Sequence, residues 1–185
     1  MERVHSGDEL AKVPAFEAVW DEAALAASAR RLAACLELPA YVSLRGPIGA
    51  GKTTFVRFLA EALGWEASDV RSPSFSLVNT YEGSKTLIHV DLYRLASARD
   101  VALLDLDDVF EGSTLLCVEW PEVGAGVLPP WDLDFEFSPG SAEGLRGVRG
   151  QAGTWLGARA LEALRSGEGA AHFRRASRSA SSESG

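Results

Sequence analysis

The sequence has little cysteine and little positive charge, and no long apolar runs. Its two cysteines, Cys35 and Cys117, have no C-x-x-C partner or nearby histidine, which argues against a disulfide framework or zinc site and predicts buried, reduced thiols. The net charge of −8 argues against a surface that wraps nucleic acid electrostatically. No apolar run reaches the roughly 20 residues of a membrane span, and the first residues lack a signal-peptide pattern. We therefore expect a cytoplasmic protein that does not associate with membranes.

One stretch carries a phosphate-binding motif. Residues 46–53, Gly-Pro-Ile-Gly-Ala-Gly-Lys-Thr, fit the P-loop pattern G-x-x-x-x-G-K-[ST]. The short apolar run 41–44 before it is typical of a strand. After it, apolar residues recur at helical spacing as far as Gly64, where a helix usually stops. Strand, glycine loop and helix form the context that a P-loop requires.

The residue types of this motif suit a nucleoside triphosphate. Small residues let the backbone N–H groups close around a phosphate, and the helix N-terminus adds positive potential. Lys52 would reach the β- and γ-phosphates, and Thr53 would place its hydroxyl on Mg²⁺. The predicted nucleotide-binding residues of the loop are Gly49, Ala50, Gly51, Lys52, Thr53 and Thr54.

Two acidic residues stand at the ends of predicted strands. Asp91 ends one apolar run, and Glu119 ends the fully apolar run 114–118. Because strand ends beside a P-loop form the ligand crevice, both carboxylates are predicted to lie at the nucleotide, although a solvent-exposed strand-end acid is the alternative. Glu119 stands where a Walker-B carboxylate would hold Mg²⁺. The predicted catalytic residues are Lys52, Asp91 and Glu119.

Other side chains near these motifs carry weaker signals. Ser72, Ser74 and Ser76 lie where P-loop switches have nucleotide-sensitive loops, but simple turn chemistry explains them equally well. His89 is predicted to be a core residue rather than a general base. Trp120 is either a packing residue or a docking residue exposed beside the site.

The remaining pattern predicts an α/β protein of the P-loop NTPase fold, with a mixed, mainly parallel sheet flanked by helices. Residues 1–165 are predicted to form a single P-loop ATPase domain, and the composition of residues 166–185 predicts a disordered tail. The other expected elements are an edge strand near 13–19, a helix at 22–38 with Asp21 as N-cap, an antiparallel pair starting at Phe75 and returning over 87–92 around a hairpin loop at 82–85, a helix at 100–110, strands at 132–137 and 145–148, and a helix at 155–164.

Four motifs, in this order and spacing, resemble one family. They are G-A-G-K-T-T-F (49–55), S-P-S-F-S-L-V (72–78), D-L-Y-R-L (91–95) and V-E-W-P-E (118–122). Together they are similar to TsaE (formerly YjeE), the bacterial tRNA threonylcarbamoyladenosine biosynthesis ATPase, from about residue 20 to 137. The resemblance implies Mg²⁺-dependent ATP hydrolysis, weak in isolation. It also implies a complex with TsaD-like and TsaB-like proteins that modifies adenosine 37 of tRNAs, with tRNA contacted only indirectly.

The resemblance also implies residue roles. Thr53 and Glu119 would bind Mg²⁺, and Asp91 would lie by the nucleotide and metal. Asp21 and Glu22 match an acidic segment near the nucleotide. The sequence departs from the family pattern at a few positions. Pro47 replaces a usually acidic residue, Ser74 and Ser76 replace threonines, and the late Gly-Arg motif is shifted or lost around 144–146.

Three other readings stay open. A small GTPase would need a late Asn/Thr-Lys-x-Asp segment, and none of the three lysines, Lys12, Lys52 and Lys85, lies in one. A small-molecule or nucleotide kinase would need an acceptor pocket and usually an arginine-rich lid, for which Arg94 and Arg99 are the only hints. A nucleotide-gated adaptor without significant catalysis would use ATP only to shape a docking surface.

Overall fold

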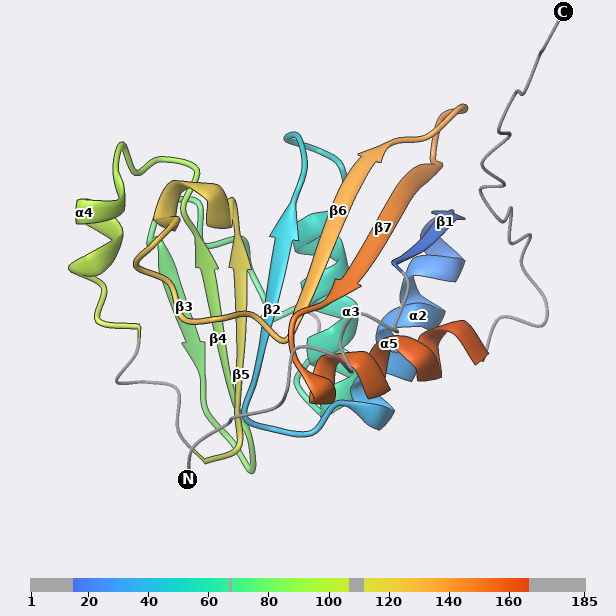
Figure 1. Cartoon of the computed structure of the whole chain (residues 1–185), viewed down its shortest axis with the longest axis horizontal. Helices are drawn as coiled ribbons and strands as arrows, with labels where there is room; N and C mark the ends of the chain where they lie inside the picture. Colours follow the sequence, from blue (N-terminus) through green and yellow to red (C-terminus); the bar gives the residue numbers. More distant parts are fainter. Residues whose placement is uncertain (1–14, 67, 107–111, 167–185) are drawn as a thin grey trace, which may run out of the picture.

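The computed structural model describes residues 15–66, 68–106 and 112–166. A seven-stranded sheet runs through the molecule, with α2, α3 and α5 on one side and α4 on the other (Figure 1). The elements are β1 (Phe16–Trp20), α2 (Glu22–Cys35), β2 (Ala40–Arg45), α3 (Lys52–Leu63), β3 (Val78–Tyr81), β4 (Thr86–Asp91), α4 (Ala98–Ala102), β5 (Thr114–Glu119), the 3₁₀ turn η1 (Pro121–Gly124), β6 (Leu133–Pro139), β7 (Arg146–Ala152) and α5 (Trp155–Ser166).

The sheet is mixed, and its centre is parallel. The strand order is β1-β7-β6-β2-β5-β4-β3, in which β6, β2, β5 and β4 are parallel neighbours. The strands β3 and β7 run antiparallel to their neighbours, and β1 pairs antiparallel with β7, so β1 has the direction of the centre. This architecture confirms the predicted α/β fold with a mixed, mainly parallel sheet.

The central strand β5 is buried on both faces, which explains its unbroken apolar run. Leu115 and Cys117 belong to the larger core under α2, α3 and α5, whereas Leu116 and Val118 belong to a smaller cluster on the α4 side. Successive side chains of a strand alternate between faces, so one run of four residues serves two cores. Burial raises the pKa of the Cys117 thiol. Both cysteines are free thiols, as predicted, but only Cys117 is fully buried, whereas Cys35 is partly exposed.

The helices flanking the first βα unit begin and end through local chemistry. The N-cap Asp21 accepts a hydrogen bond from the Ala24 amide at 2.7 Å, as predicted. The predicted end of α2 at residue 38 is wrong, because Leu36 already takes an extended conformation. Gly64 ends α3 with a φ of 107°, a left-handed conformation that glycine adopts without steric cost.

Two predicted elements are shorter than their patterns suggest. The strand expected from Phe75 begins only at Val78, because Leu77 has a φ of 65° and ends a turn. The helix expected at 100–110 is only Ala98–Ala102 among the described residues, and Asp105 has a φ of 46°. A left-handed residue continues neither a right-handed helix nor a strand. Residues 107–110 of that prediction lie outside the described residues.

The strands β6 and β7 extend the sheet beyond β2. Leu133, Phe135 and Phe137 of β6 point into the core, as predicted, but the opposite face is not uniformly wet, because Asp134 is buried and accepts hydrogen bonds from Ser43 and Arg45. The strand β7 is longer than expected.

The predicted tail lies almost entirely outside the described residues. Within the described ranges, no helix is long and apolar enough to cross a membrane.

The aromatic cluster beneath the P-loop helix yields a stability prediction. Phe55 is fully buried and packs against Phe135 at 5.4 Å and Phe137 at 5.8 Å between ring centroids. Replacing Phe55 with alanine should lower the free energy of unfolding by about 3–5 kcal/mol through lost packing and a cavity. The same change at Phe75, which is 87% exposed, should cost no more than ~1 kcal/mol. Urea unfolding followed by tryptophan fluorescence compares the two, and equal losses would contradict this account of the core.

Candidate functional site

The loop between β2 and α3 takes a conformation that depends on glycine. Gly46, Gly49 and Gly51 all have positive φ angles, of 126°, 77° and 104°. At Gly46 a Cβ atom would lie 2.1 Å from the Phe137 carbonyl oxygen, so the loop passes directly against β6. Close backbone packing and left-handed geometry together shape the curve of the P-loop.

Lys52, the first residue of α3, is almost fully buried next to this loop. Its ammonium donates to the carbonyl oxygens of Gly46 at 2.7 Å and Pro47 at 2.9 Å. It also lies 4.4 Å from the centre of the Trp120 ring, a cation–π contact. Burial lowers the pKa of Lys52, and the carboxylates of Glu119 and Asp91 oppose that shift. The lysine therefore carries its charge into a partly desolvated site, where an anion would stabilise it.

Thr53 joins the P-loop helix to the end of β5. Its hydroxyl donates to Glu119 Oε1 at 2.7 Å, and the same oxygen lies 2.9 Å from His89 Nε2. Glu119 is 3% exposed, so its carboxylate depends on these partners for solvation. The predicted pair of metal ligands is therefore in direct contact.

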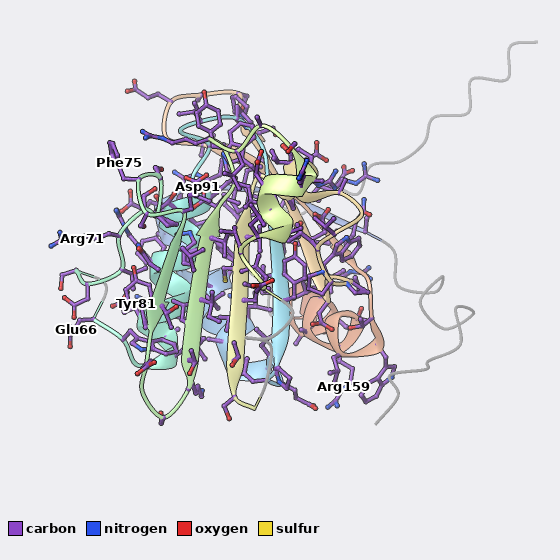
Figure 2. All side chains as sticks on the ribbon, turned by 90° about the vertical axis from the view of Figure 1, so that its left-hand side faces the viewer. Glu66, Arg71, Phe75, Tyr81, Asp91 and Arg159 are labelled. Atoms are coloured by element: carbon purple, nitrogen blue, oxygen red, sulfur yellow. The ribbon has the colours of Figure 1, made fainter. Side chains whose placement is uncertain are left out.

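Asp91 lies opposite Glu119, at the same end of the neighbouring parallel strand. The Ser74 hydroxyl donates to Asp91 Oδ2 at 2.7 Å, and the Tyr93 amide donates to Oδ1 at 3.1 Å. Ser72 and Ser74 are themselves 2.7 Å apart. Figure 2 shows Asp91 near the upper end of the sheet, with Phe75 projecting outward from the adjoining segment. This segment is thereby tied to the carboxylate end of the sheet.

Of the three serines in that segment, the last has a different role. The Ser76 hydroxyl donates to Asn79 Oδ1 at 2.6 Å, which is local turn chemistry. The two readings weighed from the sequence thus divide between residues: Ser72 and Ser74 face the site, and Ser76 stabilises the turn.

These groups surround a pocket of about 370 Å³. Most predicted site residues line it, namely Gly49, Gly51, Lys52, Thr53, Thr54, Asp91 and Glu119, together with Ile48, Ser72, Ser74, Tyr93, Arg94 and Trp120. Ala50 is buried within the loop and does not line the pocket. A larger hollow, of about 690 Å³, lies over β1, β6 and β7 but has no glycine-rich loop, so the smaller pocket is the chemically equipped one.

Glu22 is placed apart from this pocket. It is the exposed first residue of α2 and does not line the pocket. Arg146, by contrast, lies close to the P-loop. It pairs with Trp20 across β7 and β1, and its guanidinium would be 3.0 Å from a Cβ atom added to Gly51. An arginine from the shifted late motif therefore lies against the P-loop, on a side that sequence analysis left open.

His89 is the functional neighbour that the sequence analysis missed. It is fully buried, as predicted for a core residue, but it also contacts the predicted metal ligand Glu119. The available signal was strand periodicity. His89 precedes Asp91 by two residues, so both side chains lie on one face of β4.

The donor set suits Mg²⁺ held together with phosphates rather than by protein alone. Among the described residues, no group of three or more His, Cys, Asp or Glu side chains forms a metal cluster. The Thr53 hydroxyl and the Glu119 carboxylate offer oxygen ligands beside the P-loop. Mg²⁺ prefers oxygen and is usually bound by one or two protein groups plus substrate phosphates.

Comparison with known proteins agrees with this geometry. The family described as "Threonylcarbamoyl adenosine biosynthesis protein TsaE" matches residues 19–146. The chain belongs to the TsaE family. This confirms the resemblance seen in the four motifs and associates the chain with tRNA threonylcarbamoyladenosine biosynthesis.

Individual TsaE relatives match over about half of this chain. The Haemophilus influenzae protein is 38% identical over 50% of this chain and 58% of its own length. The Aquifex aeolicus protein is 47% identical over 51% of this chain and 67% of its own length. The crystal structure of Bacillus subtilis YdiB superposes with a TM-score of 0.67 and 26% identity, covering 83% of this chain and 96% of that one. The structural similarity to YdiB therefore extends over more of this chain than the sequence similarity to the two relatives does.

Two P-loop glycines should differ sharply in their tolerance of a side chain. Gly49→Ala meets no atom within 4 Å and should cost only the ~1–2 kcal/mol of a left-handed alanine. Gly46→Ala collides with the β6 backbone and should lower the free energy of unfolding by about 3 kcal/mol or more. Urea midpoints of the two variants test this, and similar midpoints would show that the loop does not depend on its approach to β6.

Proposed function

We propose that this chain is a Mg²⁺-dependent ATPase that supports the formation of N6-threonylcarbamoyladenosine at position 37 of tRNAs. The observation that carries the proposal is the 2.7 Å hydrogen bond from Thr53 to Glu119 at the mouth of the P-loop. It brings a helix-start hydroxyl and a strand-end carboxylate to one point, the arrangement in which P-loop NTPases hold Mg²⁺.

Each residue has a proposed task. The backbone of residues 49–54 cradles the phosphates, and Lys52 turns its ammonium from the loop carbonyls toward the β- and γ-phosphates. Thr53 and Glu119 hold Mg²⁺, which when bound supplies Lewis-acid stabilisation of phosphate charge. Asp91 orients groups beside the γ-phosphate, a role supported by its hydrogen bond from Ser74. Arg146 of β7 lies against the loop at Gly51, whereas Glu22, which does not line the pocket, has no proposed task.

Membership of the TsaE family supports a proposal for the cellular setting. We propose a cytoplasmic complex with TsaD-like and TsaB-like proteins, in which hydrolysis is weak until the complex assembles. The net charge of −8 supports indirect rather than direct contact with tRNA, because a net negative charge repels the phosphate backbone.

A nucleotide-gated adaptor is the second candidate, and one observation favours it. Apolar side chains are exposed around the pocket: Phe75 is 87%, Ile48 69% and Tyr93 51% exposed. Exposed aromatic residues beside a nucleotide site suit a docking surface whose shape depends on the ligand. Measurement of phosphate release separates this candidate from the ATPase.

The role of Lys52 gives a direct test of nucleotide binding. Lys52→Ala should lower ATP affinity by about 100-fold or more, because the phosphates lose a charged hydrogen-bond donor. Lys85→Ala, in the hairpin between β3 and β4, is the matched control and should leave ATP affinity unchanged. Fluorescent-ATP titration with GTP as competitor measures both affinity and base selectivity. Equal affinity in the two variants would exclude the P-loop as the binding site, and preference for GTP would favour a GTPase.

The role of Glu119 is tested in the assembled complex. Glu119→Gln keeps the size of the side chain and should retain ATP binding, while ATP hydrolysis falls on the order of 100-fold through weaker metal binding. The chain is co-purified with the TsaD-like and TsaB-like proteins, with and without ATP, and phosphate release is measured. Wild-type hydrolysis by the Glu119→Gln complex would remove Glu119 from the mechanism. Failure to assemble would argue against the proposed partners.

A further inference from the structure

His89 is a polar side chain buried in the sheet next to Glu119. It lies on β4 between Leu87 and Asp91 on the side of α3, and it is completely buried. Its register partner on β5 is Cys117, and its Nε2 atom lies 2.9 Å from Oε1 of Glu119, the next residue toward the pocket on the same face of β5. The imidazole ring therefore lies on the interior side of the Glu119 carboxylate, away from solvent.

The hydrogen-bond geometry defines what this ring does. Glu119 Oε1 receives the Thr53 hydroxyl and faces His89 Nε2, and an ionised carboxylate only accepts. Nε2 therefore carries the proton. Within the described residues the buried His89 Nδ1 has no hydrogen-bond partner. A proton there would leave a buried N–H without an acceptor, so a neutral ring that donates through Nε2 fits the site.

Both hydrogen-bond donors to the Glu119 carboxylate, from Thr53 and His89, contact the same oxygen, Oε1. The two lone pairs of Oε1 are taken by Thr53 and His89, whereas no hydrogen bond to Oε2 is found in the described part of the chain. These two hydrogen bonds fix the orientation of the carboxylate group about its side-chain bond. Its second oxygen then remains for a cation next to the Thr53 hydroxyl.

We propose that His89 is a positioning residue for the divalent cation: its Nε2–H holds Oε1 of Glu119 so that Oε2 is presented to the metal. The inference rests on the proposed function, because it deepens the Mg²⁺ site assigned there. Groups that orient a metal-ligating carboxylate affect metal affinity without touching the metal. A purely structural histidine would instead affect stability alone.

Three substitutions separate these roles. The amide nitrogen of His89→Gln can take the place of Nε2, and this variant gives up nothing at Nδ1, which has no partner among the described residues. His89→Asn is also polar but its amide is too short to reach Glu119. His89→Leu fills similar space without a donor. Thermal unfolding identifies folded variants, and the Gln–Asn comparison suffices if the leucine variant does not fold.

The readout is cation affinity rather than turnover. ATP binding is measured by calorimetry in EDTA and at increasing Mg²⁺ concentration, and Mn²⁺ binding to the ATP complex is followed by electron paramagnetic resonance. His89→Asn and His89→Leu should raise the Mg²⁺ and Mn²⁺ concentrations for half-saturation by about 10–100-fold. ATP affinity in EDTA should stay at the wild-type value in all three variants, and His89→Gln should retain wild-type cation affinity.

The outcomes are distinguishable. If wild-type protein binds ATP but shows no Mg²⁺ dependence, the proposed Mg²⁺-ATPase fails and this inference fails with it. If wild type depends on Mg²⁺ and all His89 variants keep that dependence, only the inference is overturned. A loss of ATP affinity that is the same with EDTA and with Mg²⁺ would assign His89 a structural role and would also overturn it.

Discussion

The burial of charge at one edge of the sheet is the constraint on which the rest of this structure depends. Lys52, Asp91 and Glu119 are each 3–5% exposed, and isolated charges at such depth would be strongly unfavourable. Each is compensated by named partners: loop carbonyls for Lys52, Ser74 and the Tyr93 amide for Asp91, and Thr53 and His89 for Glu119. These polar partners tie the P-loop, the 72–76 segment and two strands into one site.

The sheet supplies the positions that make such compensation feasible. The strands β4 and β5 are parallel and in register, so Asp91 and Glu119 end side by side. The strand β2 lies between β5 and β6, so the loop that follows it emerges next to Glu119 while its first glycine rests against β6. Ligands of open α/β sheets bind at this carboxyl edge for the same reason.

The site is continuous with an exposed rim. Trp120, the residue after Glu119, has a left-handed conformation and contacts both Lys52 and the ring of Tyr93, which is 5.0 Å away between centroids. Phe75 lies under the Arg94 guanidinium, 4.2 Å from the ring centre, in the segment that Ser74 ties to Asp91. Groups that line the pocket thus adjoin groups that face solvent.

The sequence by itself determined the parts whose signals are local: the P-loop, the cap residues Asp21 and Gly64, and the strand ends at Asp91 and Glu119. It also determined the family, because four short motifs retain order and spacing. Local patterns overestimated the strand at Phe75 and the helix after Asp100, where Leu77 and Asp105 take left-handed conformations that no periodicity encodes. Only the tertiary structure placed His89 behind Glu119, Ser74 on Asp91 and Arg146 against Gly51. These contacts join separate elements of the fold, so they depend on strand register and loop path, which apolar spacing along the chain does not specify.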